Sequence, residues 1–212
     1  MKKLLVTVLV LLACVESVQA GRRFLPKLAP VKVEAKYLHR SHGSPKAPLW
    51  IIEYLDFQCG SCRDSVKVMD EYIAKYPKDI YLQQRYFPLV KKHLYALKSA
   101  IYSDCAARQK KFWEFTDRIF QTQAEWASSQ DPDSYFFAAA REKGLDAAAL
   151  GACVADPEVK AGVLGEREEA RALGLHMTPS FFMDGEKIEG LPAIRAALKA
   201  HFEKKYPGKE TA

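Results

Sequence analysis

The pattern of apolar and polar positions predicts strands separated by a helix in the first half of the chain. Trp50–Phe57 (WIIEYLDF) is an apolar, aromatic run of strand length, and from Cys59 onward the apolar residues follow helical spacing as far as Tyr76-Pro77. Ile80–Phe87 (IYLQQRYF) is typical of a second strand. A strand–helix–strand unit of this length predicts a parallel pair with a right-handed crossover.

Residues 91–174 show helical periodicity and few strand signals. Gly144, Asp156-Pro157 and Gly174 mark the expected ends of helices. The apolar stripes are Leu94, Leu97, Ile101 and Cys105, then Phe112, Phe115 and Ile119, then the segment Tyr135–Lys143.

The last part of the chain predicts a hairpin and a helix. Pro179–Met183 and Lys187–Glu189 flank Asp184-Gly185, which suits a two-residue turn, and Leu191–Lys205 is amphipathic. The predicted order is therefore strand, strand, helix, strand, several helices, strand, strand, helix.

The N-terminus predicts export. A basic pair precedes an apolar stretch that is shorter than the ~20 residues of a membrane span, so residues 1–20 are interpreted as a signal peptide. Cleavage after Ala20 is the preferred interpretation, and lipidation of Cys14 within Leu11–Cys14 is the alternative, which would anchor the protein to a membrane. Residues 21–42 form a leader in which Val31–Leu38 alternates like an edge strand.

Length and composition indicate a soluble protein of one domain, or of one domain with a sizeable insertion. The chain has 212 residues and a formal net charge of +6, but its basic residues are scattered rather than interleaved with aromatic residues, which excludes nucleic acid as an expected partner. Without Cys14, four cysteines remain, and an even number suits an oxidising compartment. We therefore expect a periplasmic or other extracytoplasmic location.

The Cys59-Gly60-Ser61-Cys62 sequence favours redox chemistry. A closed zinc site would need further ligands, and no second close pair of cysteines exists in the sequence. A structural crosslink over so short a loop would constrain little of the unfolded chain. Cys59 lies at the start of the predicted helix, where free N–H groups favour a thiolate, so it is the expected nucleophile. Cys62 lies on the apolar stripe and is expected to resolve the mixed disulfide.

Two other segments add candidate site residues. Glu53 precedes Cys59 by six residues on the predicted strand, and if it faces inward it can exchange a proton with Cys62; a solvent-facing Glu53 remains the alternative. Thr178-Pro179 precedes a strand, and a cis proline there would offer backbone hydrogen bonds to a substrate.

The segments SPKAPLWIIEYLDFQCGSC and GLHMTPSFFMDG, with helices between them, resemble the DsbA family of thioredoxin-fold thiol:disulfide oxidoreductases over about residues 42–205. The resemblance implies an α/β thioredoxin fold (43–90 and 175–206) with an inserted helical domain (91–174). It implies that Cys59 and Cys62 are the redox pair, that Glu53 is the buried acid and that Thr178-Pro179 is the cis-proline loop. Many members carry Pro followed by His or Tyr between the cysteines, so Gly60-Ser61 is a departure that implies a weaker oxidant.

The remaining cysteines and histidines are less constrained. Export, the even cysteine count and a similar pair in some relatives favour a structural disulfide between Cys105 and Cys153, against two unpaired core cysteines. His176 is expected beside the site because it is close to Pro179. The other histidines are expected at the surface: His39, His42, His93 and His201.

The leading functional hypothesis is an exported monomeric enzyme that exchanges its Cys59–Cys62 disulfide with thiols of unfolded or reduced exported proteins, most simply as a net oxidase. A membrane quinone-linked thiol oxidase would then recycle it, and we expect no cofactor and no metal. A disulfide reductase or isomerase is the second hypothesis, although Gly21–His42 is too short for the dimerisation module usual in an isomerase. A non-catalytic thioredoxin-fold binding module is the third.

Overall fold

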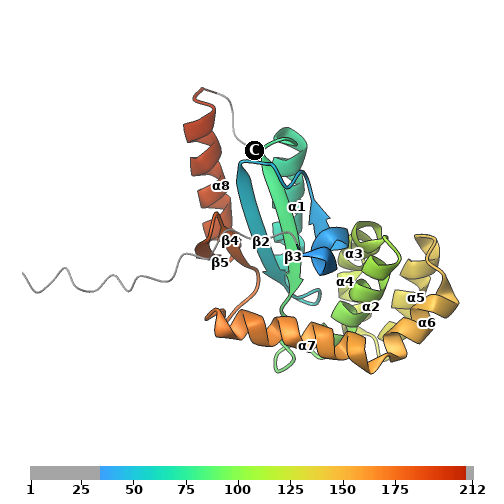
Figure 1. Cartoon of the computed structure of the whole chain (residues 1–212). Coiled ribbons are helices and arrows are strands. Elements are labelled where there is room, and N and C mark those ends of the chain that lie inside the picture. Colours follow the sequence, from blue (N-terminus) through green and yellow to red (C-terminus); the bar gives the residue numbers. More distant parts are fainter. Residues whose placement is uncertain (1–33, 209–212) are drawn as a thin grey trace, which may run out of the picture.

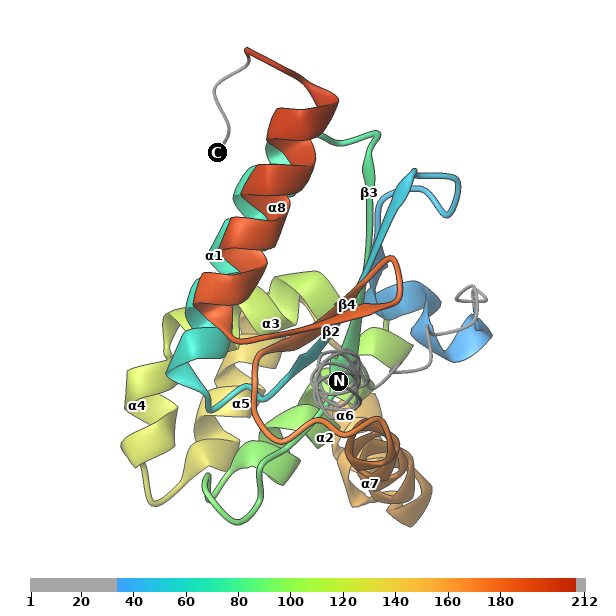
Figure 2. The ribbon, with the colours of Figure 1, turned by 90° about the vertical axis from the view of Figure 1, so that its left-hand side faces the viewer.

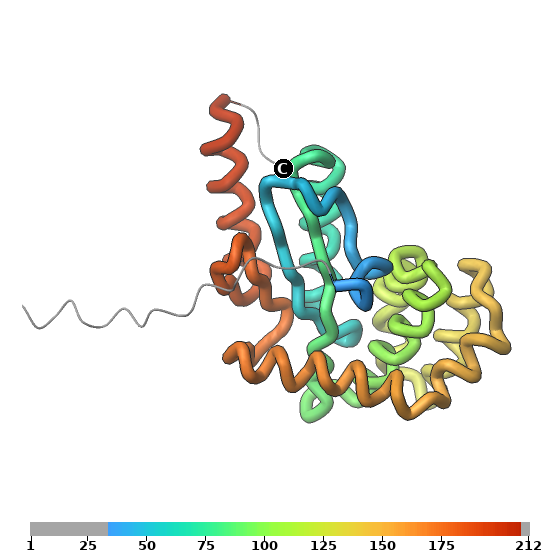
Figure 3. The backbone as a smooth tube through the Cα atoms, in the orientation of Figure 1, coloured from blue at the N-terminus to red at the C-terminus, as the bar shows by residue number. Residues whose placement is uncertain are grey.

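A five-stranded sheet lies at the centre of the structure, a computed structural model that describes residues 34–208 (Figures 1 and 3). The strand order is β1-β3-β2-β4-β5. β2 and β3 pair in parallel, which confirms the sequence prediction, and the other neighbouring strands are antiparallel. The strands are β1 (Ser41–His42), β2 (Leu49–Leu55), β3 (Ile80–Tyr86), β4 (Ser180–Met183) and β5 (Glu186–Glu189).

Helices occupy both faces of this sheet and one end of it. They are the 3₁₀-helix η1 (Ala35–Arg40), α1 (Gly60–Lys75), α2 (Ala96–Arg108), α3 (Phe112–Gln121), α4 (Gln123–Ser128), α5 (Pro132–Glu142), α6 (Ala147–Ala155), α7 (Pro157–Ala172) and α8 (Leu191–Lys205). The mixed α/β architecture confirms the predicted fold class, and α8 has the predicted bounds.

Alternate side chains of β2 point to opposite faces of the sheet, and each face is covered. Ile51 belongs to an apolar cluster with Met69 of α1 and Leu198 of α8, whereas Ile52 belongs to a cluster with Ala170 of α7. Figures 1 and 2 show α1 and α8 side by side over the first face. Because β2 is buried on both sides, its sequence is a continuous apolar run rather than an alternating one.

The helices α2–α6 form a lobe at one end of the sheet, and α7 runs from this lobe along the sheet (Figure 1). The core of the lobe reaches the cysteine motif through Phe57, whose ring centre is 5.2 Å from that of Phe120. A disulfide with an S–S distance of 2.09 Å joins Cys105 of α2 to Cys153 of α6.

The prediction of an edge strand at Val31–Leu38 is wrong for the residues of this segment that the structure describes. Residues 31–33 lie outside the described range, and Ala35–Arg40 is the 3₁₀-helix η1. Three residues per turn place Tyr37 and Arg40 on one side of this helix, and both side chains are buried. The Arg40 guanidinium stacks 4.0 Å above the Tyr86 ring and pairs with Glu166 of α7. These contacts outweigh the weak alternation, and the edge strand is instead β1.

The prediction that Leu94 is the first residue of a helical apolar stripe is also wrong. Helix α2 begins at Ala96, and Leu94 is 80% exposed. The backbone N–H of Tyr95 donates to Gln58 Oε1 at 2.7 Å, which fixes this segment against the turn before Cys59. The helix therefore starts only after that anchor.

Candidate functional site

The two cysteines of the C-x-x-C motif lie at the junction between β2 and α1. Cys59 is the N-cap residue of α1, and Cys62 lies in its first turn. Both thiols are free, with Cys59 8% exposed and Cys62 fully buried, while Gly60 and Ser61 between them are exposed. A reagent can therefore approach Cys59 but not Cys62.

The turn before Cys59 is held by the helical lobe. Gln123 of α4 donates through Nε2 to the carbonyl oxygens of Phe57 and Cys59, at 2.8 Å and 3.0 Å. Gln123 is itself buried, so water does not compete for these bonds. The lobe thus fixes the backbone on which the reactive sulfur stands.

The two thiols have opposite proton affinities. The pKa of Cys59 is lowered to about 5, chiefly because the Cys62 thiol donates a hydrogen bond to the Cys59 sulfur; contact with Thr178 adds to this, and burial opposes it. Burial is the main cause that raises the pKa of Cys62 well above its usual value. At neutral pH the pair therefore holds one thiolate, on Cys59, and one protonated thiol.

The loop before β4 lies against Cys59. The Thr178-Pro179 peptide bond is cis, and the carbonyl oxygen of Thr178 is 3.5 Å from Cys59 Sγ. Thr178 is buried, whereas Met177 before it is 46% exposed. The predicted proline loop and cysteine motif, 119 positions apart, thus meet in the structure.

Glu53 of β2 faces α1 and is fully buried, so the solvent-facing alternative is wrong. Its carboxyl group accepts hydrogen bonds from Ser65 Oγ at 2.7 Å and Gln84 Nε2 at 2.8 Å. The Ser65 hydroxyl also lies 2.9 Å from the carbonyl oxygen of Cys62. Burial raises the pKa of Glu53 to about 7, against the lowering effect of its two donors. This carboxyl group can therefore gain or lose a proton near neutral pH.

The expected surface position of His93 is wrong, because this ring takes part in the site. Its Nδ1 lies 2.9 Å from Oδ2 of the buried Asp56, and the pKa of His93 is raised, chiefly by this hydrogen bond. The Cys59 thiolate contributes to the same shift, so a protonated His93 in turn favours that thiolate. His93 lies 37 positions from Asp56, and no local motif connects the two residues.

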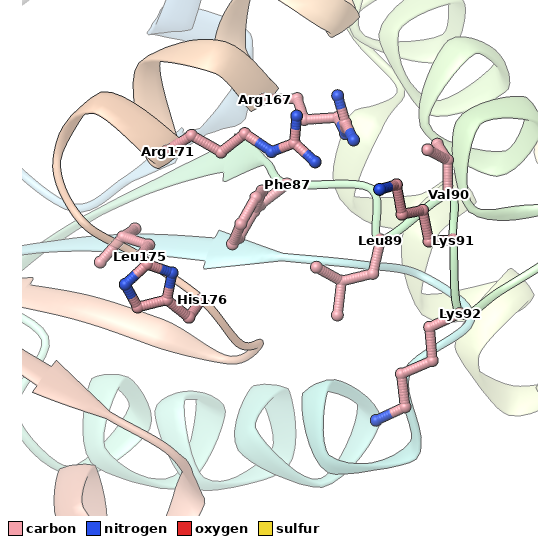
Figure 4. A pocket seen from close by; sticks show the side chains of 9 residues that line it. All are labelled: Phe87, Leu89, Val90, Lys91, Lys92, Arg167, Arg171, Leu175 and His176. Carbon is pink, nitrogen blue, oxygen red and sulfur yellow. The ribbon is translucent and has the colours of Figure 1, made fainter.

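The remaining predicted residues are His176, whose place beside the sulfurs stays a prediction, and the second cysteine pair. His176 is exposed and lines a pocket with Arg171 and Leu175 (Figure 4). The disulfide of Cys105 and Cys153 lies within the helical lobe. Residues 34–208 contain no group of three or more His, Cys, Asp or Glu side chains placed to hold a metal ion.

The expected signal peptide (1–20), its Cys14 and most of the leader lie outside the described residues. Within the described range, no helix combines the length and apolar character needed to cross a membrane.

Comparison with known proteins gives one family and several structural neighbours. The family model described as thioredoxin matches residues 37–200. The crystal structure of a thioredoxin-like oxidoreductase from Silicibacter pomeroyi has a TM-score of 0.67 at 21% identity, covering 83% of this chain and 95% of its own, which shows the shared fold. Alpha-DsbA1 of Wolbachia pipientis has a TM-score of 0.59 at 25% identity, covering 73% and 80%.

A Na(+)/H(+) antiporter NhaA 1 of Mycolicibacterium gilvum is 32% identical over 168 residues. That match covers 78% of this chain but 26% of the antiporter, so the chain spans about a quarter of the length of this relative. The similarity therefore concerns one part of a longer protein.

Proposed function

The chain belongs to the thioredoxin family, with a DsbA-like fold, and on this basis we propose that it is a protein thiol:disulfide oxidoreductase in which Cys59 and Cys62 are the redox pair. The observation that carries the proposal is the unequal state of two neighbouring sulfurs. Cys59 is a reachable thiolate with a pKa of about 5, and Cys62 is a buried thiol with a raised pKa. A nucleophile and a protected resolving thiol are what disulfide exchange requires.

The exchange proceeds in two steps with balanced electrons and protons. A substrate thiolate attacks Cys59 Sγ of the oxidised pair; a mixed disulfide forms, the Cys59–Cys62 bond breaks, and Cys62 leaves as a thiolate that takes up a proton. A second substrate thiolate then attacks the substrate sulfur of the mixed disulfide and releases the Cys59 thiolate. Two electrons pass from the substrate to the pair.

Glu53 is proposed as the group that supplies the proton to Cys62 and removes it in the reverse direction. Its pKa of about 7 suits either role near neutral pH. It is buried under α1 and shares Ser65 with the Cys62 backbone. Thr178 and Pro179 are proposed to present backbone groups to the substrate chain that is bonded to Cys59.

The direction proposed is net oxidation. A Cys59 pKa of about 5 instead of 9.0 stabilises the reduced form at pH 7 by roughly 3 kcal/mol, which corresponds to about 60 mV towards a more oxidising couple. The proposed substrates are unfolded or reduced exported proteins, and a membrane quinone-linked thiol oxidase would reoxidise the pair. A periplasmic or other extracytoplasmic location is part of this proposal.

The test combines two cysteine variants with a redox titration. Cys59→Ser should abolish oxidation of a reduced, unfolded protein. In Cys62→Ser the Cys59 thiolate can still attack a disulfide-bonded substrate protein and release one substrate thiolate, and the mixed disulfide should then accumulate because the resolving thiol is missing. Equilibration in glutathione buffers gives the potential of the pair. A potential as reducing as about −270 mV, with no oxidation of the unfolded protein, would place the chain among reductases. Normal turnover in the Cys59 variant would overturn the assignment of Cys59 as the nucleophile, and no exchange by the unaltered chain would leave only a binding module.

A further inference from the structure

A pocket of about 260 Å³ lies beside the two loops that hold Cys59 (Figure 4). One wall comes from the loop after β3, a second from the C-terminal half of α7, and a third from the segment before Thr178. Its lining side chains are Phe87, Leu89, Val90, Leu175, Lys91, Lys92, Arg167, Arg171 and His176. The first four are apolar and the other five are basic, and no carboxylate is among them.

The positive charge of this pocket is only partly neutralised. Glu168 pairs with Arg167 at 2.5 Å and with Arg171 at 3.3 Å, so one carboxylate serves two guanidinium groups. Lys91 and Lys92 are exposed, and within residues 34–208 neither has a carboxylate within 4.0 Å. The pocket therefore offers cationic groups to a ligand from outside.

The same loops expose apolar side chains. Val90 is 39% exposed, Leu94 80% and Met177 46%, and these are three of the five large hydrophobic residues exposed in the described part of the chain. Exposed apolar side chains that gather near a site indicate binding of another molecule more strongly than single scattered ones do. The surface beside Cys59 is thus both apolar and basic.

Short connections link the pocket to the reactive sulfur. The backbone N–H of Leu89 donates to Asp56 Oδ2 at 2.9 Å, and Asp56 belongs to the turn before Cys59. On the other side, His176 precedes Thr178 by two residues, and the Thr178 carbonyl oxygen is 3.5 Å from Cys59 Sγ. A polypeptide bonded to Cys59 advances ~3.3 Å per residue when extended, so residues close to its cysteine can reach walls built from these loops.

We propose that this pocket is a subsite for acidic side chains near the reacting cysteine of a polypeptide substrate. The inference rests on the proposed function and deepens it, because it names the substrate class: extended segments in which Asp or Glu lies within a few residues of the cysteine. The lysines and the pair of arginines attract the carboxylates, and the exposed apolar side chains contact the rest of the segment. The chemical step remains the attack of a substrate thiolate on Cys59 Sγ, and the subsite alters only which thiols reach Cys59.

The experiment compares two unstructured peptides that have one cysteine each and differ only in Asp and Glu against Asn and Gln beside it. The oxidised full chain is mixed with excess peptide, the reaction is stopped with acid, and the reduced protein is measured over time. We expect the acidic peptide to react ~3–10-fold faster at low salt, with the ratio falling towards 1 in high salt. In K91Q/K92Q the ratio should fall towards 1 even at low salt.

A matched control separates local charge from net charge. K199Q/K204Q removes the same two charges from α8, which does not line the pocket, and should keep the full ratio. Circular dichroism checks that each variant is folded. Glutathione against its diester, in which both carboxylates are blocked, tests the other source of carboxylates. A preference for glutathione over the diester that K91Q/K92Q loses, with no preference between the peptides, would assign the pocket to a small thiol and overturn the polypeptide subsite.

The two levels of proposal fail differently. If neither peptide reduces the oxidised protein, the proposed function fails. If both peptides react equally fast, or if K91Q/K92Q keeps the preference, the subsite is refuted while the oxidoreductase function stands.

Discussion

Replacing Cys62 by alanine or by serine tests the origin of the low Cys59 pKa. The largest cause of that pKa of about 5 is the hydrogen bond that the Cys62 thiol donates to the Cys59 sulfur. Alanine removes the donor, whereas serine keeps a hydroxyl group in its place. The pair of variants therefore isolates the hydrogen bond from the loss of the second sulfur, which both variants share.

The size of the effect follows from the strength of a hydrogen bond to a charged acceptor. Such a bond contributes about 1.5–3 kcal/mol, and one pKa unit corresponds to about 1.4 kcal/mol. Removing it should raise the pKa of Cys59 by about 1–2 units in Cys62→Ala. In Cys62→Ser the rise should be less than half as large, because the hydroxyl is a stronger donor on a slightly shorter arm.

The measurement is the ultraviolet absorbance of the thiolate as a function of pH, repeated as the pH dependence of the alkylation rate. Cys105 and Cys153 are joined in a disulfide, so Cys59 is the one described cysteine that titrates in either variant. Equal pKa values in the alanine and serine variants would refute the hydrogen-bond account and leave Thr178 and the end of α1 as the sources of thiolate stabilisation.

Three further predictions concern stability. Burial raises the Glu53 pKa from 4.5 to about 7, so between these pH values the folded protein keeps a proton that the unfolded chain releases. The free energy of unfolding therefore falls by about 3 kcal/mol as the pH rises from 4.5 to 7. Glu53→Gln should remove that fall, which urea unfolding at about pH 5 and pH 8 measures. The 48-residue separation of Cys105 and Cys153 predicts that C105A/C153A lowers the unfolding free energy by about 4 kcal/mol, and a loss near zero would contradict the entropy argument. Glu166→Ala strands the buried Arg40 and should cost about 3–5 kcal/mol; a change under 1 kcal/mol would mean that water reaches Arg40.

The parts of the fold that the sequence predicts are those with strong local periodicity. The buried run that forms β2, the amphipathic stripe of α8 and the Asp184-Gly185 turn each have a signal within a few residues. In the turn both residues have positive φ, 49° and 85°, which suits this dipeptide. The strand prediction for Ala35–Arg40 was wrong because the conformation of this segment depends on contacts with β3 and α7, which the local alternation of residues does not encode.

The candidate site also contains residues that the sequence predicts and residues that it does not. The two-residue spacing of Cys59 and Cys62 is compatible with only a few kinds of site, and the proline in Thr178-Pro179 restricts the backbone locally. Both segments could therefore be identified as candidate site residues from the sequence. The burial of Glu53 could not, because alternation leaves both faces of a central strand open until α1 and α8 are placed. His93 gave no signal at all, since its role depends on contact with a carboxylate 37 positions away.

The charge state of the motif therefore depends on more than the two residues between its cysteines. Gly60 and Ser61 lack an ionisable side chain, yet the Cys59 pKa is still lowered to about 5, chiefly because the Cys62 thiol donates a hydrogen bond to the Cys59 sulfur. The Asp56 carboxylate acts in the opposite direction on Cys59, but the same carboxylate holds His93 in place and favours its protonated form. The side-chain hydrogen bond to Asp56 raises the pKa of His93, a residue of a different loop, and the helical lobe fixes the turn on which these groups meet.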